Sequence, residues 1–497
     1  MVTCDQRLEN VFSLIDKKRY FIFQSPRQTG KTTNMIAFAK KLNAQEKYIA
    51  LYVNVEAGQA CRNDVEAVNE IIVSEFEHSA MTFLPDQYQP SDDCYKIRSL
   101  NTGLSAFLTK WCRELPKSLV LFLDEIDALI GDSLISVLRQ LRSGYTRRPK
   151  AFPHAMCLIG VRDIRDYRIY SDSAKKYIIG GSAFNIKEKS IRLNNFTFDQ
   201  IKDLYTQHTD QTGQAFSNQA IERVFELTDG QPWLVNALAR EICFEDSIAQ
   251  GQTVTVDHVN IAKEVLIERR DVHLDQLADK LTEPRVMRVI QTILLGEYQE
   301  NSILPDDIQY LIDLGLIKKG SSGLEIANPI YREVIPRELT AVTQISINQN
   351  PAWYIHENGK LNIDKLLDEY IRFYKQHSEM ITARKTYTEA AHHLFFMAWL
   401  QRIVNSGGII EREYAAGLKR LDLCVRFSGE DFAFELKLSS KTALDEGKKQ
   451  LVEYLNRLEL NSGYLIIFSR KKVEDWETLG KREIAAFEGK QIEVIYL

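Results

Sequence analysis

The stretch Ser25-Pro26-Arg27-Gln28-Thr29-Gly30-Lys31-Thr32-Thr33 decides the fold of the first part of this chain. It follows a short apolar and aromatic run at residues 20–24, which predicts a buried strand. Helical spacing of apolar residues follows from Lys31 to Leu42. A strand, a turn and a helix in this order are typical of a phosphate-binding loop, in which backbone N–H groups at the helix N-terminus hold the anion.

The residue types in the loop match the binding of ATP and Mg²⁺. Lys31 is placed to reach the β- and γ-phosphates, and the Thr32 hydroxyl is placed to hold Mg²⁺. The other residues expected to line the phosphates are Ser25, Arg27, Gln28, Thr29, Gly30 and Thr33. Ser25 stands where the usual pattern has its first glycine. The alternative is a chance surface loop, against which a second motif argues.

That second motif is the apolar run 119–123 followed by Asp124-Glu125-Ile126-Asp127. Asp124, at the end of a predicted buried strand, would hold Mg²⁺ through water, and Glu125 would orient or deprotonate the attacking water. The alternative is an acidic strand end that caps the next helix. The presence of the phosphate loop upstream favours the catalytic interpretation.

Two further places are candidates for nucleotide contacts. Arg162 follows the apolar run 158–161 and could sense the γ-phosphate, or it could be a solvated surface arginine. Gly230-Gln231-Pro232 opens a predicted helix, and this turn could approach the nucleotide closely or simply start the helix. The pair Arg147 and Arg148 is interpreted as a solvated loop rather than as a finger acting on a neighbouring subunit.

Alternating strands and helices around these motifs predict an α/β fold with a parallel, helix-covered sheet. The other strands are expected at residues 48–54, 118–123 and 156–161, and the other helices at 63–77 and 103–113. A wholly helical pattern follows Phe198. Helix, turn and hairpin signals at residues 306–327 suggest a winged helix.

Residues 1–340 resemble the AAA-like P-loop ATPases of the STAND and archaeal-ATPase group. The resemblance rests on residues 25–33, on Leu123-Asp-Glu-Ile126, on Arg162 and on residues 230–232. It implies an ATPase core followed by a helical lid and a winged helix. It also implies that Arg162 is a sensor and that Gly230 and Pro232 contact nucleotide.

A second set of chemical residues lies near the C-terminus. Asp422 begins a predicted strand at 421–427, and Glu435 and Lys437 share one face of the next, at 431–437. Two carboxylates that bind Mg²⁺ and a lysine that positions water suit phosphodiester hydrolysis. The alternative is a solvated hairpin with a cross-strand ion pair. Further elements are expected as a helix at 387–405, a strand at 410–414, a helix at 442–457 and a strand at 463–468.

This arrangement resembles the PD-(D/E)XK nuclease superfamily: Asp422, then Glu435-x-Lys437. The resemblance implies that Glu389, in a preceding helix, and Gln450, in a following one, lie beside the metal. His392 and His393 are interpreted as one packed and one solvated side chain. The lysines 441, 448 and 449 could contact a phosphate backbone or form a solvated face.

Composition limits the classes of function. The chain has 497 residues and a net charge of −5, so a strongly basic nucleic-acid binder is not expected. Residues 351–497 carry equal numbers of basic and acidic side chains, so the whole excess belongs to residues 1–350. An apolar signal segment or membrane span is not apparent. The 7 cysteines lack CxxC spacing, which favours reduced thiols, a cytoplasmic location and no cysteine zinc site.

The sequence thus predicts five parts: an ATPase core (1–195), a helical lid (196–270), a winged helix (271–340), a linker (341–352) and a nuclease-like α/β domain (353–497). The main hypothesis is an ATPase whose nucleotide state licenses Mg²⁺-dependent cleavage of nucleic acid, with DNA expected. A homo-oligomer through the ATPase domain is also considered. Defence against foreign DNA is compatible with the resemblance, although no residue indicates it. The alternatives are a nucleotide-dependent switch or scaffold with a non-cleaving partner-binding domain and, ranked last, a DNA-binding regulator acting through the winged helix.

Overall fold

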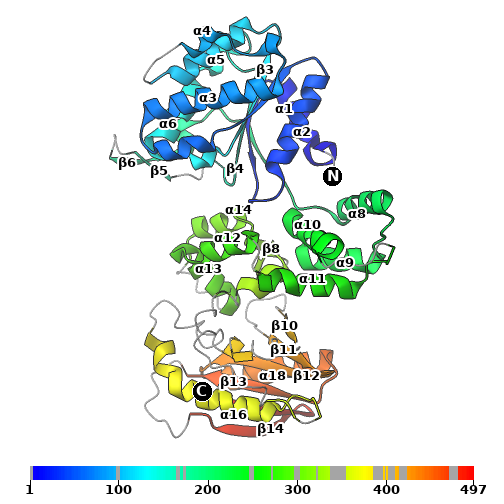
Figure 1. Cartoon of the computed structure of the whole chain (residues 1–497). Helices are drawn as coiled ribbons and strands as arrows, with labels where there is room; N and C mark the ends of the chain where they lie inside the picture. Colours follow the sequence, from blue (N-terminus) through cyan, green and yellow to red (C-terminus); the bar gives the residue numbers. More distant parts are fainter. Residues whose placement is uncertain are drawn as a thin grey trace. The chain divides into compact units, whose positions relative to one another are not determined.

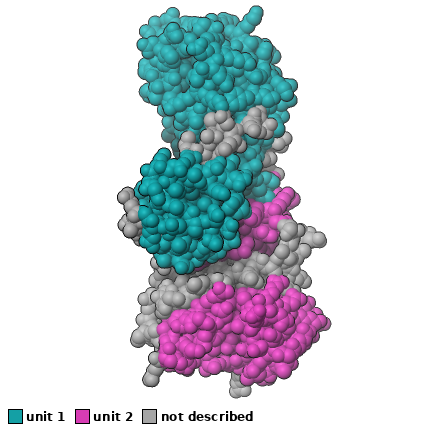
Figure 2. Space-filling model, turned by 90° about the vertical axis from the view of Figure 1, so that its right-hand side faces the viewer, with its two compact units in different colours: residues 1–273, 309–316 teal, residues 274–308, 317–497 magenta. Residues whose placement is uncertain are grey.

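The fold was analysed in a computed structural model of the chain. It forms two compact units, residues 1–273 with 309–316 and residues 274–308 with 317–497 (Figure 2). The structure describes residues 4–96, 101–163, 168–171, 175–245, 251–269, 272–295, 303–320, 323–335, 338, 354–356, 358–383, 396–397, 399–400, 409–413, 422–469 and 479–497. None of the helices in these ranges is long and apolar enough to cross a membrane.

The first unit is built around a five-stranded sheet in the order β2-β3-β4-β1-β7, in which every neighbouring pair is parallel. Its strands are β1 (Tyr20–Gln24), β2 (Ile49–Asn54), β3 (Leu119–Asp124), β4 (Ala155–Gly160) and β7 (Lys189–Arg192). The four strands predicted from apolar runs are confirmed. The edge strand β7 was not predicted, because its sequence Lys-Ser-Ile-Arg has no apolar run.

Helices cover both faces of this sheet, because strand side chains alternate between the faces and both sets are apolar. On one face, Leu51 and Leu121 pack with α3 (Val65–Phe83), α5 (Gly103–Glu114) and α6 (Gly131–Ser143). On the other, Tyr52 and Phe122 pack with α1 (Cys4–Asp16) and α2 (Lys31–Ala44) (Figure 1). Helices α1 and α6 are additions to the sequence prediction.

A group of helices follows the sheet, as the sequence predicts. They are α8 (Phe198–Thr212), α9 (Asn218–Thr228), α10 (Pro232–Arg240) and α11 (Val256–Arg269). Local sequence fixes their ends: the Thr197 and Gln200 side chains form a capping box at α8, and Ser217 caps α9. A hairpin of β5 (Arg168–Ser171) and β6 (Lys176–Ile179), followed by α7 (Gly180–Ala183), precedes this group.

The next segment has the element order expected of a winged helix. It contains α12 (Val272–Leu281), α13 (Pro284–Leu295), α14 (Pro305–Asp313) and an antiparallel hairpin of β8 (Ile317–Gly320) and β9 (Gly323–Ile326). Residues 309–316 belong to the first compact unit, whereas the flanking residues belong to the second. The winged helix and the limits of the five predicted parts remain predictions.

The C-terminal part contains a second, mixed sheet in the order β10-β11-β12-β13-β15-β14. Its strands are β10 (Ile409–Glu413), β11 (Asp422–Phe427), β12 (Glu430–Leu438), β13 (Ser462–Phe468), β14 (Arg482–Phe487) and β15 (Lys490–Tyr496). Strands β12, β13 and β15 run parallel, and the outer pairs are antiparallel. The predicted strands are confirmed, while β14 and β15 were not foreseen.

Among the described residues, helices α18 and α16 pack on this sheet. Helix α18 (Ala443–Arg457) covers the face that includes Ala433 and Leu465. Helix α16 (Ile363–Ala383) contacts the sheet through Tyr374, whose ring lies 5.9 Å from that of Phe468. Of the helix predicted at 387–405, the described residues 396–397 and 399–400 are helical. Glu389, His392, His393 and the linker 341–352 lie outside the described residues.

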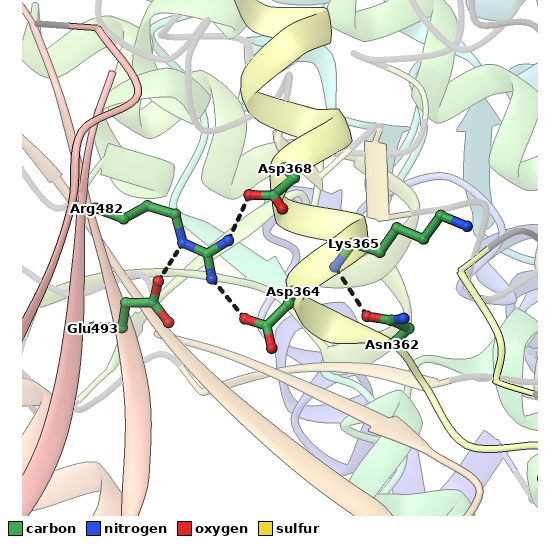
Figure 3. A network of polar contacts seen from close by, with 6 residues as sticks. All are labelled: Asn362, Asp364, Lys365, Asp368, Arg482 and Glu493. Atoms are coloured by element: carbon green, nitrogen blue, oxygen red, sulfur yellow. Dashed lines mark hydrogen bonds and ion pairs between the residues drawn. The ribbon is translucent and has the colours of Figure 1, made fainter.

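Polar contacts fix α16 to the edge of the sheet (Figure 3). The Arg482 guanidinium, on β14, donates to Asp364 and to Asp368 at 2.6 Å each and also pairs with Glu493 on β15. Its side chain is 23% exposed, so these charge-assisted bonds are partly shielded from water. This cluster has a structural role, because every carboxylate in it is engaged by the same cation.

Candidate functional site

The phosphate loop joins β1 to α2 at the carboxyl edge of the parallel sheet. Two residues have left-handed backbone conformations: Gln28, with φ 57°, and Gly30, with φ 84°, which is the N-cap of α2. The Lys31 ammonium donates to the carbonyl oxygens of Ser25 at 2.8 Å and Pro26 at 2.9 Å, so it spans the loop. Burial lowers the pKa of Lys31, and the carboxylates of Glu125 and Asp124 oppose that shift.

Ser25 is compatible with the loop even though the usual pattern has glycine there. Its φ is not positive, so the position makes no demand for glycine. The side chain is buried, and its hydroxyl donates to the Leu193 carbonyl at 3.0 Å. Thr29 closes the turn by donating to the Pro26 carbonyl at 2.9 Å. The remaining predicted loop residues, Arg27, Gln28 and Thr33, are exposed.

Thr32 and Asp124, which are far apart in sequence, meet at the predicted metal site. The Thr32 hydroxyl donates to Asp124 Oδ2 at 2.7 Å. A second donor, the Tyr52 hydroxyl, lies 2.7 Å from the same oxygen, and the Glu125 N–H donates to Oδ1 at 2.8 Å. Asp124 is 0% exposed, and all these donors are neutral. A buried carboxylate beside a hydroxyl fits Mg²⁺, which takes oxygen ligands.

Glu125 directly follows this carboxylate and has a left-handed backbone, with φ 56°. A non-glycine residue there is strained, and such strain is common at functional sites. Burial, and then the carboxylates of Asp127 and Asp124, raise the pKa of Glu125. Asp127 Oδ2 accepts from the Val161 N–H at 3.0 Å, so this residue links the acidic strand end to the end of β4. The conformation and pKa of Glu125 are both compatible with a base that acts on water.

Arg162 lies at the end of β4, as predicted, but it is not a solvated surface residue. Its side chain is 12% exposed, and its Nε lies 3.3 Å from Asp313 Oδ2. The guanidinium also lies over the Tyr310 ring, 5.1 Å from the centroid. Gly315, two residues after Asp313, packs on the phosphate loop, since a Cβ there would lie 2.7 Å from Pro26 Cγ. The segment 309–316 therefore contacts both the predicted sensor and the phosphate loop.

The turn Gly230-Gln231-Pro232 packs against the loop that leaves β7. The Gly230 carbonyl accepts from the Phe196 N–H at 2.8 Å, and a Cβ on Gly230 would lie 1.9 Å from the Phe196 oxygen. Only glycine fits this approach, and φ is 69°. Pro232 occupies the first turn of α10, where its missing N–H costs nothing.

Arg7, which the sequence analysis did not single out, joins this region to the phosphate loop. It donates to the Thr29 carbonyl at 3.0 Å and to the Asn194 carbonyl at 2.6 Å, and it lies over the Phe196 ring. Burial lowers its pKa to about 10. A lone arginine in an N-terminal helix gives no sequence signal for this contact, because the partners are brought together only by the fold.

Arg147 and Arg148 both have partners within the fold, although Arg147 is exposed. Arg147 donates to the Ser105 hydroxyl at 2.7 Å, and the Arg148 guanidinium lies 3.4 Å from the centroid of the Tyr145 ring. The interpretation as an exposed loop therefore stays a prediction, with the addition that both side chains have contacts.

The sheet order, the phosphate loop and the Thr32–Asp124 contact define an ATPase-like P-loop protein, the class for which ATP is the implied nucleotide. Within that class, the model of the AAA-like domain matches residues 9–336, and the chain belongs to that family. No curated protein sequence matches the chain.

Several solved structures are similar to this chain at low identity. A Walker-type ATPase of Pyrococcus abyssi is 15% identical, with 67% of this chain and 96% of that chain covered and a TM-score of 0.48. The Holliday junction branch migration motor RuvB of Thermotoga maritima is 14% identical over 67% and 92% of the two chains, with a TM-score of 0.35. Cdc6p from Pyrobaculum aerophilum is 17% identical over 69% and 94%, with a TM-score of 0.36.

The C-terminal candidate site centres on Glu435 and Lys437 of β12. The Lys437 ammonium lies 2.6 Å from Glu435 Oε1, and the two side chains are 15% and 1% exposed. The pair lies along one strand and is buried, while the same hairpin also has a partly exposed cross-strand ion pair between Arg426 and Asp431. Asp422 lies directly opposite Glu435 in the β11–β12 ladder, and opposite positions share a face. Only the backbone of Asp422 is described.

Helix α18 closes over this pair. Gly447 packs on Lys437, because a Cβ there would lie 3.3 Å from Lys437 Cγ. Gln450, one turn further along α18, has a buried Oε1 atom that accepts no hydrogen bond from any described residue. A buried amide oxygen that lacks a donor fits a cation or its bound water. Within the described ranges, no group of three or more His, Cys, Asp or Glu side chains forms a metal site.

Proposed function

We propose that the chain binds and hydrolyses ATP with Mg²⁺ and that its nucleotide state licenses Mg²⁺-dependent cleavage of nucleic acid, with DNA as the expected substrate, by residues 353–497. The observation that carries the nucleotide part is the 2.7 Å contact between Thr32 and Asp124, made beside a formed phosphate loop. Membership of the AAA-like domain family supports the same class of activity.

In the proposed ATPase reaction, each polar residue of the site has a separate task. Lys31 exchanges the Ser25 and Pro26 carbonyls for the β- and γ-phosphates, while Thr32 and Asp124 hold the metal. Bound Mg²⁺ neutralises charge that develops on the phosphoryl oxygens. Glu125 orients or deprotonates water, and its raised pKa suits a base.

The other proposed nucleotide contacts are made by a side chain that must first move, Arg162, and by residues of the two loops. Arg162 would sense the γ-phosphate once it leaves Asp313. The loop residues Ser25, Arg27, Gln28, Thr29, Gly30 and Thr33, together with Gly230 and Pro232, would line the nucleotide.

The proposed nuclease site uses Asp422 and Glu435 as metal ligands and Lys437 to position water or stabilise phosphate charge. Its support is the burial of Glu435 beside Lys437 and the position of Asp422 opposite Glu435. Gln450 would hold a ligand water, since its buried Oε1 is an available acceptor. Glu389 completes the proposed set. Bound Mg²⁺ would activate the attacking water.

A second candidate function is a nucleotide-dependent switch with a non-cleaving C-terminal domain. The observation that favours it is the 2.6 Å contact between Lys437 and Glu435, which already compensates the charge of the carboxylate. Assembly into a homo-oligomer through the ATPase domain and a winged helix at residues 271–340 belong to both proposals.

The deciding experiment incubates the full-length protein with labelled single-stranded DNA, double-stranded DNA and RNA, with Mg²⁺ and with or without ATP. Cleavage that requires Mg²⁺ and rises with ATP is expected for the wild type. Glu125→Gln should retain ATP binding and lower ATP turnover by about 100-fold or more, which is typical of losing a general base. Lys437→Met should remove cleavage and leave ATP hydrolysis intact.

The wild type itself discriminates the two candidates. ATP hydrolysis without cleavage of any nucleic acid under these conditions would rule out the nuclease and support the switch. Mass measurement by light scattering, with and without ATP, tests the homo-oligomer.

A further inference from the structure

The Tyr52 hydroxyl is a donor to Asp124 that lies outside both nucleotide motifs. Tyr52 is on β2, where it pairs with Phe122 of β3, while Asp124 pairs with Asn54. Tyr52 and Asp124 are therefore diagonal neighbours on the same face of a parallel sheet, within reach of a long aromatic side chain. The Tyr52 ring is buried in the core beneath α1 and α2, and its hydroxyl reaches Asp124 Oδ2 at 2.7 Å.

The contact has a consequence for the way in which Asp124 is held. Asp124 Oδ2 accepts from both Tyr52 and Thr32, whereas Oδ1 accepts from the Glu125 N–H. A hydroxyl has one proton and two lone pairs, so the Thr32 oxygen can bind a cation as a second task while its proton stays on Asp124. Tyr52 has no such second task, because its ring is packed in the core. It can hold the carboxylate in place whether or not Thr32 also binds a cation.

We propose that Tyr52 is a positioning residue for the Mg²⁺–nucleotide site and acts by fixing the orientation of the Asp124 carboxylate. This inference rests on the proposed binding of ATP with Mg²⁺. Loss of the Tyr52 hydroxyl should therefore weaken nucleotide binding in the presence of Mg²⁺ and leave binding without Mg²⁺ unchanged. The reason is that the hydroxyl contacts Asp124 Oδ2, the proposed metal ligand. Among the described residues of the phosphate loop, Thr32 is the one that contacts the same oxygen.

The competing explanation is that the hydroxyl simply satisfies its hydrogen bond at the nearest buried acceptor. In that case its loss would lower stability without changing the dependence on metal. The chain offers a matched control in Tyr48, whose hydroxyl also donates to an aspartate, Asp16 Oδ1, at 2.8 Å. Asp16 is exposed and lies outside the nucleotide site.

The experiment measures the affinity of the full-length protein for a fluorescent ATP analogue, in EDTA and across a Mg²⁺ titration. Tyr52→Phe should weaken Mg²⁺-supported binding by about tenfold, the scale of one hydrogen bond to a charged group. Its affinity in EDTA should equal that of the wild type. Tyr48→Phe should behave as the wild type in both conditions.

Thermal unfolding and a double variant complete the test. Tyr52→Phe in an Asp124→Asn background should add little further loss of Mg²⁺-dependent binding, since the hydroxyl is proposed to act through that carboxylate. Equal weakening with and without Mg²⁺, an unchanged Mg²⁺ titration, or an unfolded metal-free Tyr52→Phe protein would each overturn the inference. A wild type that binds no nucleotide at all would instead overturn the proposed function.

Discussion

The two candidate sites each place a buried carboxylate in a strand beside a helix, yet the two carboxylates have different kinds of partner. Asp124, at the end of β3, accepts from three neutral donors, Thr32, Tyr52 and the Glu125 N–H. Glu435, within β12, contacts the Lys437 ammonium at 2.6 Å. Neutral donors orient a carboxylate and leave its negative charge for a cation, whereas a lysine compensates that charge directly.

The difference shows that two buried carboxylates can be prepared for a metal to different degrees. Asp124 already lies beside the Thr32 hydroxyl, whose oxygen keeps lone pairs for a cation. Glu435 must loosen its contact with Lys437 before a cation can use its full charge. Asp124 is therefore better prepared for a cation than Glu435.

The largest effect is expected at the nucleotide site. Lys31→Ala should weaken ATP binding by about 1000-fold, because it removes a buried cation from the phosphates and leaves their charge uncompensated. Fluorescence titration with an ATP analogue measures this loss. Lys40→Ala, on the exposed side of the same helix, is the control and should bind as the wild type does. Similar affinities for the two variants would contradict the assignment of Lys31.

The second prediction concerns the charge compensation at Glu435. Lys437→Met should destabilise the C-terminal part by about 3 kcal/mol, because it leaves a buried carboxylate without its cation. Chemical denaturation followed by far-UV circular dichroism measures the change.

The double variant Glu435→Gln with Lys437→Met separates structure from catalysis. It should recover most of the lost stability, since neither charge remains. It should still fail to cleave nucleic acid. Recovery of both would show that the pair has no part in the chemistry.

A smaller effect is expected from the contact between Arg162 and Asp313. Asp313→Asn removes the charge that holds the guanidinium, so Arg162 should become more available to the γ-phosphate. A gain of about fivefold in ATP turnover is expected, the lower end of typical coupling between two sites. Steady-state hydrolysis assays measure it, and Arg162→Ala should abolish the gain. A turnover that falls instead would mean that Asp313 supports Arg162 in its active position.

The smallest expected effect tests whether the two sites belong to units that unfold separately. Burial lowers the pKa of His154 below its usual value of 6.5, so the folded protein disfavours the charged ring. Stability from this residue is complete above the unfolded pKa and is lost as the pH falls through the lower, folded pKa. His154→Gln should reduce the acid sensitivity of unfolding by under about 1 kcal/mol.

Calorimetry between pH 7 and pH 5 reports the transition of each unit. Only the transition of the unit that contains Asp124 should respond to His154→Gln. His78→Gln, at an exposed position of α3, is the control. A change in both transitions would indicate that the units unfold together.

Local sequence determined the buried strands and the start of helix α2, because each depends on residues that are close together in the chain. The apolar runs at residues 20–24 and 118–123 formed β1 and β3, because buried strands of a parallel sheet are apolar on both faces. Gly30 opened α2 with the left-handed backbone that glycine allows. The burial of the Glu435–Lys437 pair was not predicted, since it depends on how α18 covers the strand.

The sequence by itself therefore determined the phosphate loop, the acidic strand end and the order of strands and helices. Tertiary structure decided which side chains meet there. Tyr52 reaches Asp124 across 72 residues of sequence, and Arg162 reaches Asp313 across 151. Such contacts depend on strand order, register and helix packing, which are set by the whole core and leave no local pattern in the chain.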